Sequence, residues 1–135
     1  MKIAVVQMDV AFADPDRNFG QVEGFIEEAA KAGTDVIVLP EMWNAGYALK
    51  ELERLADVNG ERTKEFLSRL AKKHHVHIVG GSVATKKNGR FYNTMYVVDQ
   101  SGEIVSEYDK AHLFKLMDEH KFMSAGEKAN VFSLA

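Results

Sequence analysis

The sequence of 135 residues contains no cysteine and only two prolines. Without a thiol, the chain can form neither a disulfide nor a zinc–thiolate site. It also has no apolar run near the roughly 20 residues that a membrane span requires. The start of the chain, residues 1–8, shows only a short apolar stretch with no small-residue cleavage site after it. We therefore expect a cytoplasmic protein with no membrane partner.

An excess of basic charge is absent as well. Lys and Arg number 17 against 20 Asp and Glu, for a formal net charge of -3. Surfaces that bind nucleic acid are strongly basic, so we expect no nucleic-acid partner. Hydrophobic residues make up 46% of the chain and charged residues 27%, as in ordinary globular domains. A chain of this length buries about two-thirds of its unfolded surface, and the sequence predicts one domain over residues 1–135.

Strand and helix patterns alternate in the first part of the chain. Residues 3–8 form a short β-rich run. Residues 14–33 open with Asp-Pro, a typical helix start, continue with apolar residues at helical spacing, and end at a glycine. Residues 36–39 are an apolar strand that stops at Pro40, because proline cannot donate a ladder hydrogen bond. Glu41 therefore follows directly after a buried strand.

The rest of the chain predicts two more helices and a β-meander. Leucines mark a short helix over 49–55, and a longer apolar pattern ends at the basic run 72–74, where cations suit a helix C-terminus. Asn88-Gly89 predicts a type I′ hairpin turn. This order of elements indicates an α/β protein with a layered sheet. The remaining predicted strands are 76–83, interrupted by two glycines, then 91–98, 104–108 and the beginning of one at 130–134.

Two charged residues stand at the ends of predicted strands, Glu41 and Lys110. Loops at strand ends converge in such sheets, so these two side chains could meet although they are far apart in the sequence. A carboxylate beside an ammonium can act as a general base next to a fixed positive charge that stabilises an oxyanion. On spacing alone, however, such a pair is more often a solvated or paired surface couple.

Other candidate sites are weaker. His75 and His77 would share one face of a strand and could bind a metal, but no pair of carboxylates stands beside them. We favour a solvated or locally hydrogen-bonded cluster there and assign neither a metal nor a cofactor. Ser82 and Ser106 lack the glycine-flanked elbow that a serine hydrolase needs.

Several segments together resemble the carbon–nitrogen hydrolase (nitrilase) superfamily, in the order in which its motifs occur. In addition, Glu119-His120 with Phe122 and Gly126 is similar to the omega-amidase branch, whose members hydrolyse amides of small 2-oxo dicarboxylic acids. The superfamily motifs are matched by the opening IAVVQ (3–7), VLPEMWNAGY (38–47), GGS (80–82), YNT (92–94) and YDKAHLF (108–114).

The resemblance implies the N-terminal part of an αββα sandwich, with a mixed sheet covered by helices on one face, and a Glu-Lys-Cys mechanism. Glu41 matches the general base, Lys110 the lysine that stabilises the tetrahedral intermediate, and Glu119 the second, positioning glutamate. Trp43, Tyr47 and His112 are expected around the substrate. Trp43 and Tyr47 could instead be simple packing, and His112 would orient its loop rather than transfer protons.

The resemblance also implies a cysteine nucleophile that this chain does not contain. In family members it follows the strand that begins here at about residue 130. We therefore expect the N-terminal half of an amidase for a small-molecule amide, inactive alone, which self-associates through the sheet face that its helices leave open. The alternative is a non-catalytic module that binds small carboxylates or partner chains.

Overall fold

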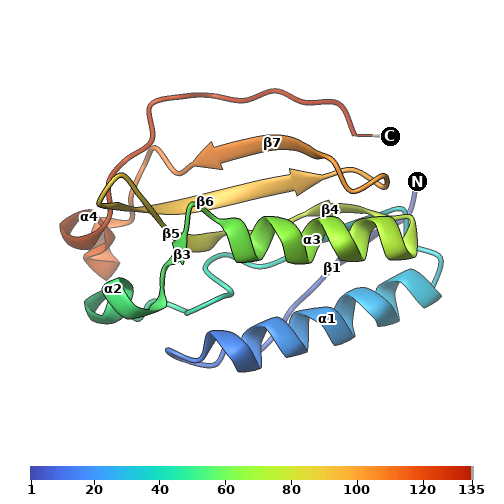
Figure 1. The fold of residues 1–135 in the computed structure, drawn as a ribbon, viewed down its shortest axis with the longest axis horizontal. Helices are drawn as coiled ribbons and strands as arrows, with labels where there is room; N and C mark the ends of the chain where they lie inside the picture. Colours follow the sequence, from blue (N-terminus) through green and yellow to red (C-terminus); the bar gives the residue numbers. More distant parts are fainter. Residues whose placement is uncertain (135) are drawn as a thin grey trace.

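Helices and strands alternate along the chain in the computed structural model, which describes residues 1–134 (Figure 1). Short 3-10 turns precede the second and fourth helices, η1 at Leu49–Glu51 and η2 at Lys115–Met117. In chain order the other elements are β1 (Ile3–Val5), α1 (Pro15–Lys31), β2 (Val36–Val38), α2 (Leu52–Leu55), β3 (Asp57–Val58), α3 (Glu61–His74), β4 (His77–Val79), β5 (Val83–Lys87), β6 (Arg90–Val98), β7 (Ile104–Asp109) and α4 (Glu119–Phe122).

The strands form one mixed sheet in the order β1-β2-β4-β6-β5-β3, with β7 paired to β6. β1, β2 and β4 are parallel, whereas β6 runs antiparallel to β4, β5 and β7. β4 and β5 follow one another along the same edge of β6, because Ile78 pairs with Val98 and Val83 with Thr94. The other edge of β6 carries β7. This arrangement brings the ends of β2, β6 and β7 to one region of the sheet.

Helices α1 and α3 lie side by side over one face of the sheet (Figure 1). The start of α1 is fixed by the Asp14 side chain, which accepts a hydrogen bond from Arg17 N at 3.1 Å. Its apolar face buries Phe19, Val22 and Ile26, and each such side chain contributes about 1.5–3 kcal/mol. This burial places the main core between the two helices and the sheet.

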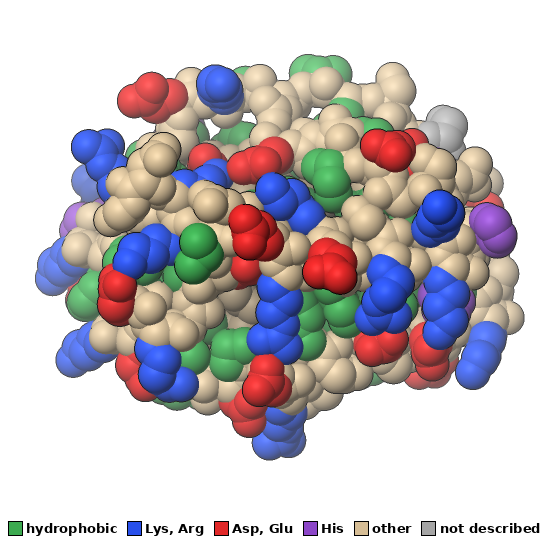
Figure 2. Space-filling model, in the orientation of Figure 1, with side chains coloured by type: hydrophobic (Ala, Val, Ile, Leu, Met, Phe, Trp, Pro, Cys, Tyr) green, Lys and Arg blue, Asp and Glu red, His purple; other side chains and the backbone are tan. Residues whose placement is uncertain are grey.

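Opposite charges are interspersed on the outer side of these helices (Figure 2). Exposed pairs of this kind contribute at most about 1 kcal/mol each, so apolar burial rather than charge holds the helices in place. The pairs that link α1 to α3 are Asp16–Arg62, Glu23–Arg69 and Glu27–Lys73.

Most of the predicted elements are confirmed. Asn88 and Gly89 have the positive φ values, 51° and 75°, that the hairpin turn requires, and Lys87 pairs with Arg90. The predicted strand 76–83 is divided at its two glycines, and its second part continues to Lys87 as β5. The two-residue strand β3 was not predicted, because so short a segment carries no alternation.

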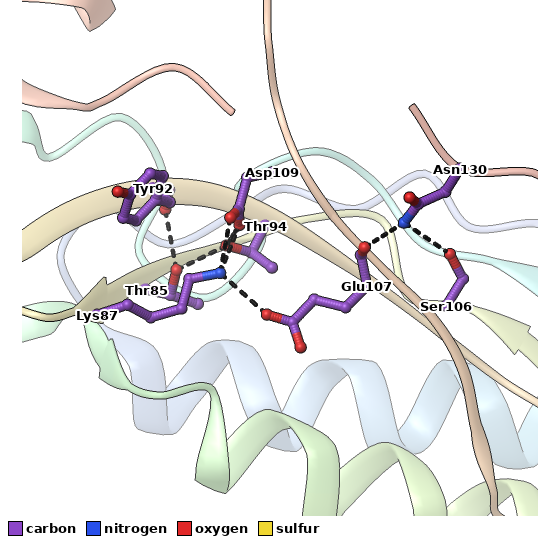
Figure 3. Close-up of polar contacts among 8 residues, drawn as sticks. All are labelled: Thr85, Lys87, Tyr92, Thr94, Ser106, Glu107, Asp109 and Asn130. Atoms are coloured by element: carbon purple, nitrogen blue, oxygen red, sulfur yellow. Dashed lines mark hydrogen bonds and ion pairs between the residues drawn. The ribbon is translucent and has the colours of Figure 1, made fainter. Parts of the chain in front are cut away.

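The predicted strand at 130–134 is wrong. These residues adopt neither helix nor strand, and Val131 is 101% exposed. No ladder pairs them within residues 1–134, and a strand exists only where a neighbour completes its backbone hydrogen bonds. The segment is instead tethered by one side chain, since Asn130 Nδ2 donates to Ser106 Oγ at 3.2 Å and to the carbonyl oxygen of Glu107 on β7 (Figure 3).

The sheet face opposite α1 and α3 is incompletely covered. Ile3 and Val5 on β1 are 53% and 69% exposed. Their ladder neighbours on the same face, Val38 and Val79, are half-buried. This exposure agrees with the sheet face that the sequence predicts the helices to leave open, because no element covers this end of the sheet within residues 1–134. In the same residues no helix is both long enough and apolar enough to cross a bilayer.

Gly81 joins β4 to β5 and offers a test of this geometry. Its φ is +58°, and an added Cβ would lie 2.0 Å from the carbonyl oxygen of Pro40. We expect Gly81→Ala to lower the free energy of unfolding by clearly more than the ~1–2 kcal/mol of a left-handed alanine, because the backbone of the segment before Glu41 must move as well. Urea unfolding measures the loss.

Gly89→Ala is the matched control, because Gly89 has a φ of +75° and no atom within 4 Å of an added Cβ. The Gly89→Ala variant therefore has only the cost of the left-handed conformation, without a steric clash. Equal losses for the two variants would contradict the close approach at Gly81.

Candidate active site

Glu41 lies in a turn that the structure holds against Ser82. The backbone N–H of Met42 donates to Ser82 Oγ at 3.0 Å, and that of Trp43 donates to the carbonyl oxygen of Ser82 at 3.0 Å. Ser82 N in turn donates to the carbonyl oxygen of Pro40 at 3.2 Å. Met42 has a positive φ of 52°, which turns the chain sharply after β2. These bonds fix the backbone on both sides of Glu41.

Lys110 follows the last residue of β7, so its backbone continues the sheet. Its N–H donates to the carbonyl oxygen of Asn93 on β6 at 2.9 Å, and its own carbonyl oxygen accepts from Gly126 N at 3.0 Å. The peptide groups before and after the Lys110 side chain are thus each held by one hydrogen bond. Successive side chains of a strand point to opposite faces, so Lys110 and Asp109 leave β7 in opposite directions.

The two predicted residues meet, as expected from their positions at strand ends. Lys110 Nζ lies 2.8 Å from Glu41 Oε1 and 3.0 Å from Glu119 Oε2. The sequence prediction that Glu41 and Lys110 are in contact is confirmed, and Glu119 joins them at the same ammonium. We refer to Glu41, Asn93, Lys110 and Glu119 as the charged cluster.

Asn93 is the member for which the sequence predicts no role of its own, since it occurs there only within the motif YNT (92–94). Its Nδ2 donates at 2.9 Å to Glu41 Oε1 and at 2.9 Å to Glu119 Oε1, and the residue is buried. Its backbone oxygen also accepts from Lys110 N. One residue therefore contacts both glutamate carboxylates and the backbone of Lys110. An asparagine is unfavourable in a strand interior, and this local inconsistency was the available signal.

The two glutamates have different surroundings. Glu119 is fully buried, and both of its oxygens are occupied, because Oε2 also accepts from Phe114 N at 2.8 Å. The side chain of Glu41 is 49% exposed. Its bonds from Asn93 and Lys110 both end on Oε1, so its other oxygen receives neither. Only Glu41 can offer a carboxylate oxygen to an incoming group.

Burial and neighbouring charges shift the pKa values in the charged cluster. Burial raises the pKa of Glu41, but hydrogen bonds, led by that from Lys110, outweigh it and bring the pKa below its ordinary value. Burial lowers the pKa of Lys110, yet its bonds to the two glutamates raise it above the ordinary lysine value. Burial, followed by the charge of Glu41, raises the pKa of Tyr47. At neutral pH, Glu41 and Lys110 are therefore ionised and Tyr47 keeps its proton.

The three residues expected around the substrate have different fates. Tyr47 lies beside Glu41, and a hydrogen bond from it is among the causes of the lowered Glu41 pKa. Trp43 is fully buried, donates from Nε1 to the carbonyl oxygen of Gly80 at 2.9 Å, and packs on Phe19 with ring centroids 4.7 Å apart. A substrate cannot reach it, so the packing alternative holds for Trp43. His112 is exposed in the loop after β7, and its role stays a prediction.

Comparison with known proteins identifies a family. The profile of the family described as carbon-nitrogen hydrolase matches residues 2–135. The chain is 49% identical over 132 residues to 2-oxoglutaramate amidase from Bacillus subtilis (strain 168), which covers 98% of this chain and 51% of that protein. It is 31% identical to omega-amidase NIT2 from Homo sapiens, over 97% of this chain and 50% of that protein. The predicted resemblance to omega-amidases is confirmed.

Solved structures agree with the fold. Nit3 from Saccharomyces cerevisiae, described as a member of branch 10 of the nitrilase superfamily, superposes with a TM-score of 0.87 at 28% identity. That match covers 98% of this chain and 51% of the Nit3 chain. The predicted fold class is thereby confirmed. The chain spans about half the length of the curated relatives that it matches.

Replacing Glu41 by Gln tests the ionisation of the charged cluster. A carboxyl group whose pKa is lowered by folding stabilises the protein above its unfolded pKa, about 4.3 for Glu, and this contribution is lost as pH falls through the folded value. We therefore expect the stability advantage of the parent over Glu41→Gln to be largest near neutral pH and to shrink below about pH 4. Urea unfolding over this pH range measures it.

Glu65→Gln is the matched control, because Glu65 is an exposed glutamate on α3 outside the charged cluster. A stability difference between the parent and Glu41→Gln that stays constant as the pH falls would contradict the ionisation assigned here.

Proposed function

The chain belongs to the carbon–nitrogen hydrolase family, and we propose that it supplies the charged groups of an amidase active site. The observation that carries this proposal is one ammonium, Lys110 Nζ, bound at 2.8 and 3.0 Å by Glu41 and Glu119. A buried carboxylate, an exposed carboxylate and a cation within hydrogen-bond reach of one another provide a base, a fixed positive charge and a group that orients them.

Glu41 is the proposed general base. A cysteine thiol would give its proton to Glu41 as its sulfur attacks the amide carbon, and the proton would pass to the departing nitrogen as the C–N bond breaks. Ammonia would depart, and a thioester between the cysteine and the acyl group would remain. Water would then give a proton to Glu41 and attack the thioester carbon, and return of that proton to the sulfur would release the acid and restore the thiol. Glu41 is suited to each transfer, because it is ionised and half-exposed.

Lys110 is the proposed electrostatic stabiliser of the tetrahedral intermediate. Its bonds to the two glutamates raise its pKa, so its charge is present throughout the neutral range. Glu119 has both oxygens occupied and no solvent exposure. It is therefore a positioning carboxylate rather than a second base. Removal of a preorganised donor such as the Lys110 ammonium typically lowers kcat by about 10²–10³.

The thiol must come from outside these 135 residues, because they contain no cysteine. We propose that the chain alone is inactive and that it forms a single domain with the part that carries the nucleophile. The substrate would be the amide of a small carboxylic acid, by analogy with the relatives named 2-oxoglutaramate amidase and omega-amidase. A cavity of about 590 Å³ is lined by Phe12, Tyr47 and Phe122 and provides space for such a molecule. Tyr47 connects this cavity to Glu41, with which it shares a hydrogen bond.

Electrostatics favours this proposal over a module that binds small carboxylates. Glu41 and Glu119 carry two negative charges against the single positive charge of Lys110, so an anionic ligand would meet a net negative site. Like charges within a few Å repel each other. The amide group and the thiol that would react at the charged cluster are neutral before they react and meet no such barrier, and the free carboxylate of a substrate such as 2-oxoglutaramate would lie away from Glu41 and Glu119.

A chimera tests the proposed function. Residues 1–135 are fused to the remaining half of the Bacillus subtilis 2-oxoglutaramate amidase, and ammonia release from 2-oxoglutaramate is measured. We expect turnover by the chimera and none by the 135-residue chain. In the chimera, Glu41→Gln should lower kcat by about 10²–10⁴, the usual contribution of a general base.

Lys121→Met is the control for Lys110→Met in the same chimera, since Lys121 is an exposed cation near the charged cluster that pairs only with Asp118 among residues 1–134. Only Lys110→Met should reduce turnover. Ammonia release by the 135-residue chain, abolished by Glu41→Gln, would overturn the requirement for a thiol. A folded chimera in which Glu41→Gln retained full activity would sink the role of Glu41.

We also propose that the isolated chain self-associates through its open sheet face. Ile3 and Val5 are more than half exposed on that face, and contiguous apolar patches larger than a few hundred Å² are rare on monomers. Multi-angle light scattering should show a species larger than the monomer, and Val5→Lys should reduce it. Val58→Lys is the control, because Val58 is 57% exposed on β3 at the other edge of the sheet. A monomeric parent chain would disprove the proposal.

A further inference from the structure

A second polar network lies on the face of the sheet that α1 and α3 cover, opposite the face of the charged cluster. Figure 3 shows its side chains. Lys87 Nζ binds both carboxylate oxygens of Asp109, at 2.6 and 2.9 Å, and Glu107 Oε1 at 2.9 Å. Thr94 Oγ1 donates to Asp109 Oδ1 at 2.7 Å. The hydroxyl of Thr85 lies 2.6 Å from that of Thr94. These residues come from β5, β6 and β7, and we refer to them as the rear network.

The rear network and the charged cluster are built from adjacent residues. Thr94 and Asp109 are direct cross-strand partners, and their side chains point to the helix side. The next residues outward, Asn93 and Lys110, are joined by the bond from Lys110 N to the carbonyl oxygen of Asn93, and their side chains enter the charged cluster. Because side chains alternate along a strand, a shift of either backbone would move both groups together.

The segment around Gly126 packs directly against the backbone of Asp109 and Lys110. Gly126 N donates to the carbonyl oxygen of Lys110, and a Cβ at Gly126 would lie 2.1 Å from the carbonyl oxygen of Asp109. The chain therefore passes this peptide at a distance that only glycine permits. The side chain of Asp109 and both backbone polar groups of Lys110 are thus hydrogen-bonded.

The rear network is well shielded for an ionic group. The side chains of Lys87 and Asp109 are 19% and 26% exposed. Burial lowers the pKa of Lys87, but hydrogen bonds to Asp109 and then Glu107 outweigh it and raise that pKa. A charged pair in such surroundings persists only with well-placed partners. It carries none of the proposed chemistry, because it faces away from Glu41 and Glu119.

We propose that Asp109 is a positioning residue, which through Thr94 and Lys87 fixes the end of β7 so that Lys110 Nζ stays between Glu41 and Glu119. This inference rests on the proposed function, because the position of Lys110 Nζ matters for catalysis only if Lys110 stabilises the tetrahedral intermediate. The placement itself is measurable without turnover.

The test uses the 135-residue chain and carbon-13 NMR of the Glu41 carboxyl during a pH titration, together with hydrogen exchange of the Lys110 amide. Asp109→Asn removes the charge that holds Lys87, and Thr94→Val removes the hydroxyl with little change of volume. In both variants we expect Glu41 to titrate at higher pH than in the parent, because Lys110 moves away from it. Exchange at Lys110 N–H should accelerate by about tenfold, which corresponds to the loss of roughly one net hydrogen bond.

Two variants separate positioning from general stability. Thr94→Ser retains the hydroxyl and should restore the parent titration of Glu41. Glu107→Gln removes the other carboxylate that binds Lys87 but leaves the Asp109–Thr94 bond, so it should leave both readouts unchanged at a similar cost in stability. The inference is overturned if Thr94→Val and Asp109→Asn match Glu107→Gln in both readouts. If Asp109→Asn fails to fold, the Thr94 pair alone decides the matter. The same NMR changes in Asp109→Asn and Thr94→Val without any loss of ammonia release by the chimera would leave the inference standing and count against the proposed function instead.

Discussion

The burial of the Glu119 carboxylate is the constraint on which the candidate site depends. An ionised carboxylate without solvent is costly unless each oxygen finds a donor. Glu119 has three, and they come from three different segments: Asn93 on β6, Lys110 after β7 and the backbone of Phe114 in the following loop. The chain after β7 can therefore not move away from the sheet without leaving a buried charge unpaired. The lysine is positioned by the same requirement.

The sheet itself links stability to the site by using both faces of two strands. On β6 and β7, one residue of each neighbouring pair enters the rear network and the other enters the charged cluster. The helix side contributes ionic and hydroxyl contacts that hold the ladder, and the open side carries the groups with proposed chemistry. A rigid ladder limits the freedom of Lys110 without any contact to its ammonium. Such support from a scaffold is what preorganised electrostatic stabilisation requires.

Much of this arrangement could be predicted from local patterns, and the rest depends on distant partners. The Asp-Pro start of α1 and the Asn88-Gly89 turn are determined by φ preferences and capping, which are properties of a few neighbouring residues. Glu41 and Lys110 could be placed at strand ends for the same reason. Asn93 was not assigned, because its role comes from side chains that are distant in the sequence. For Trp43 the sequence left substrate contact and simple packing open, because its position beside Glu41 says nothing about the direction of its ring. The strand expected at 130–134 failed because strand formation needs a neighbouring edge.

The contrast between the two glutamates explains how one cluster can be both rigid and reactive. Removing one partner of a buried, hydrogen-bonded charge typically costs about 3–5 kcal/mol, whereas exposed pairs contribute about 0–1 kcal/mol. Glu119 belongs to the first class and Glu41, at 49% exposure, is close to the second. The inner carboxylate thus holds Lys110 and Asn93 in place. The outer one is held at Oε1 by these same two residues and is half-exposed, which leaves its protonation free to change without loss of the fold. The buried Glu119 therefore fixes the geometry of the charged cluster, and the half-exposed Glu41 is the carboxylate available for proton transfer.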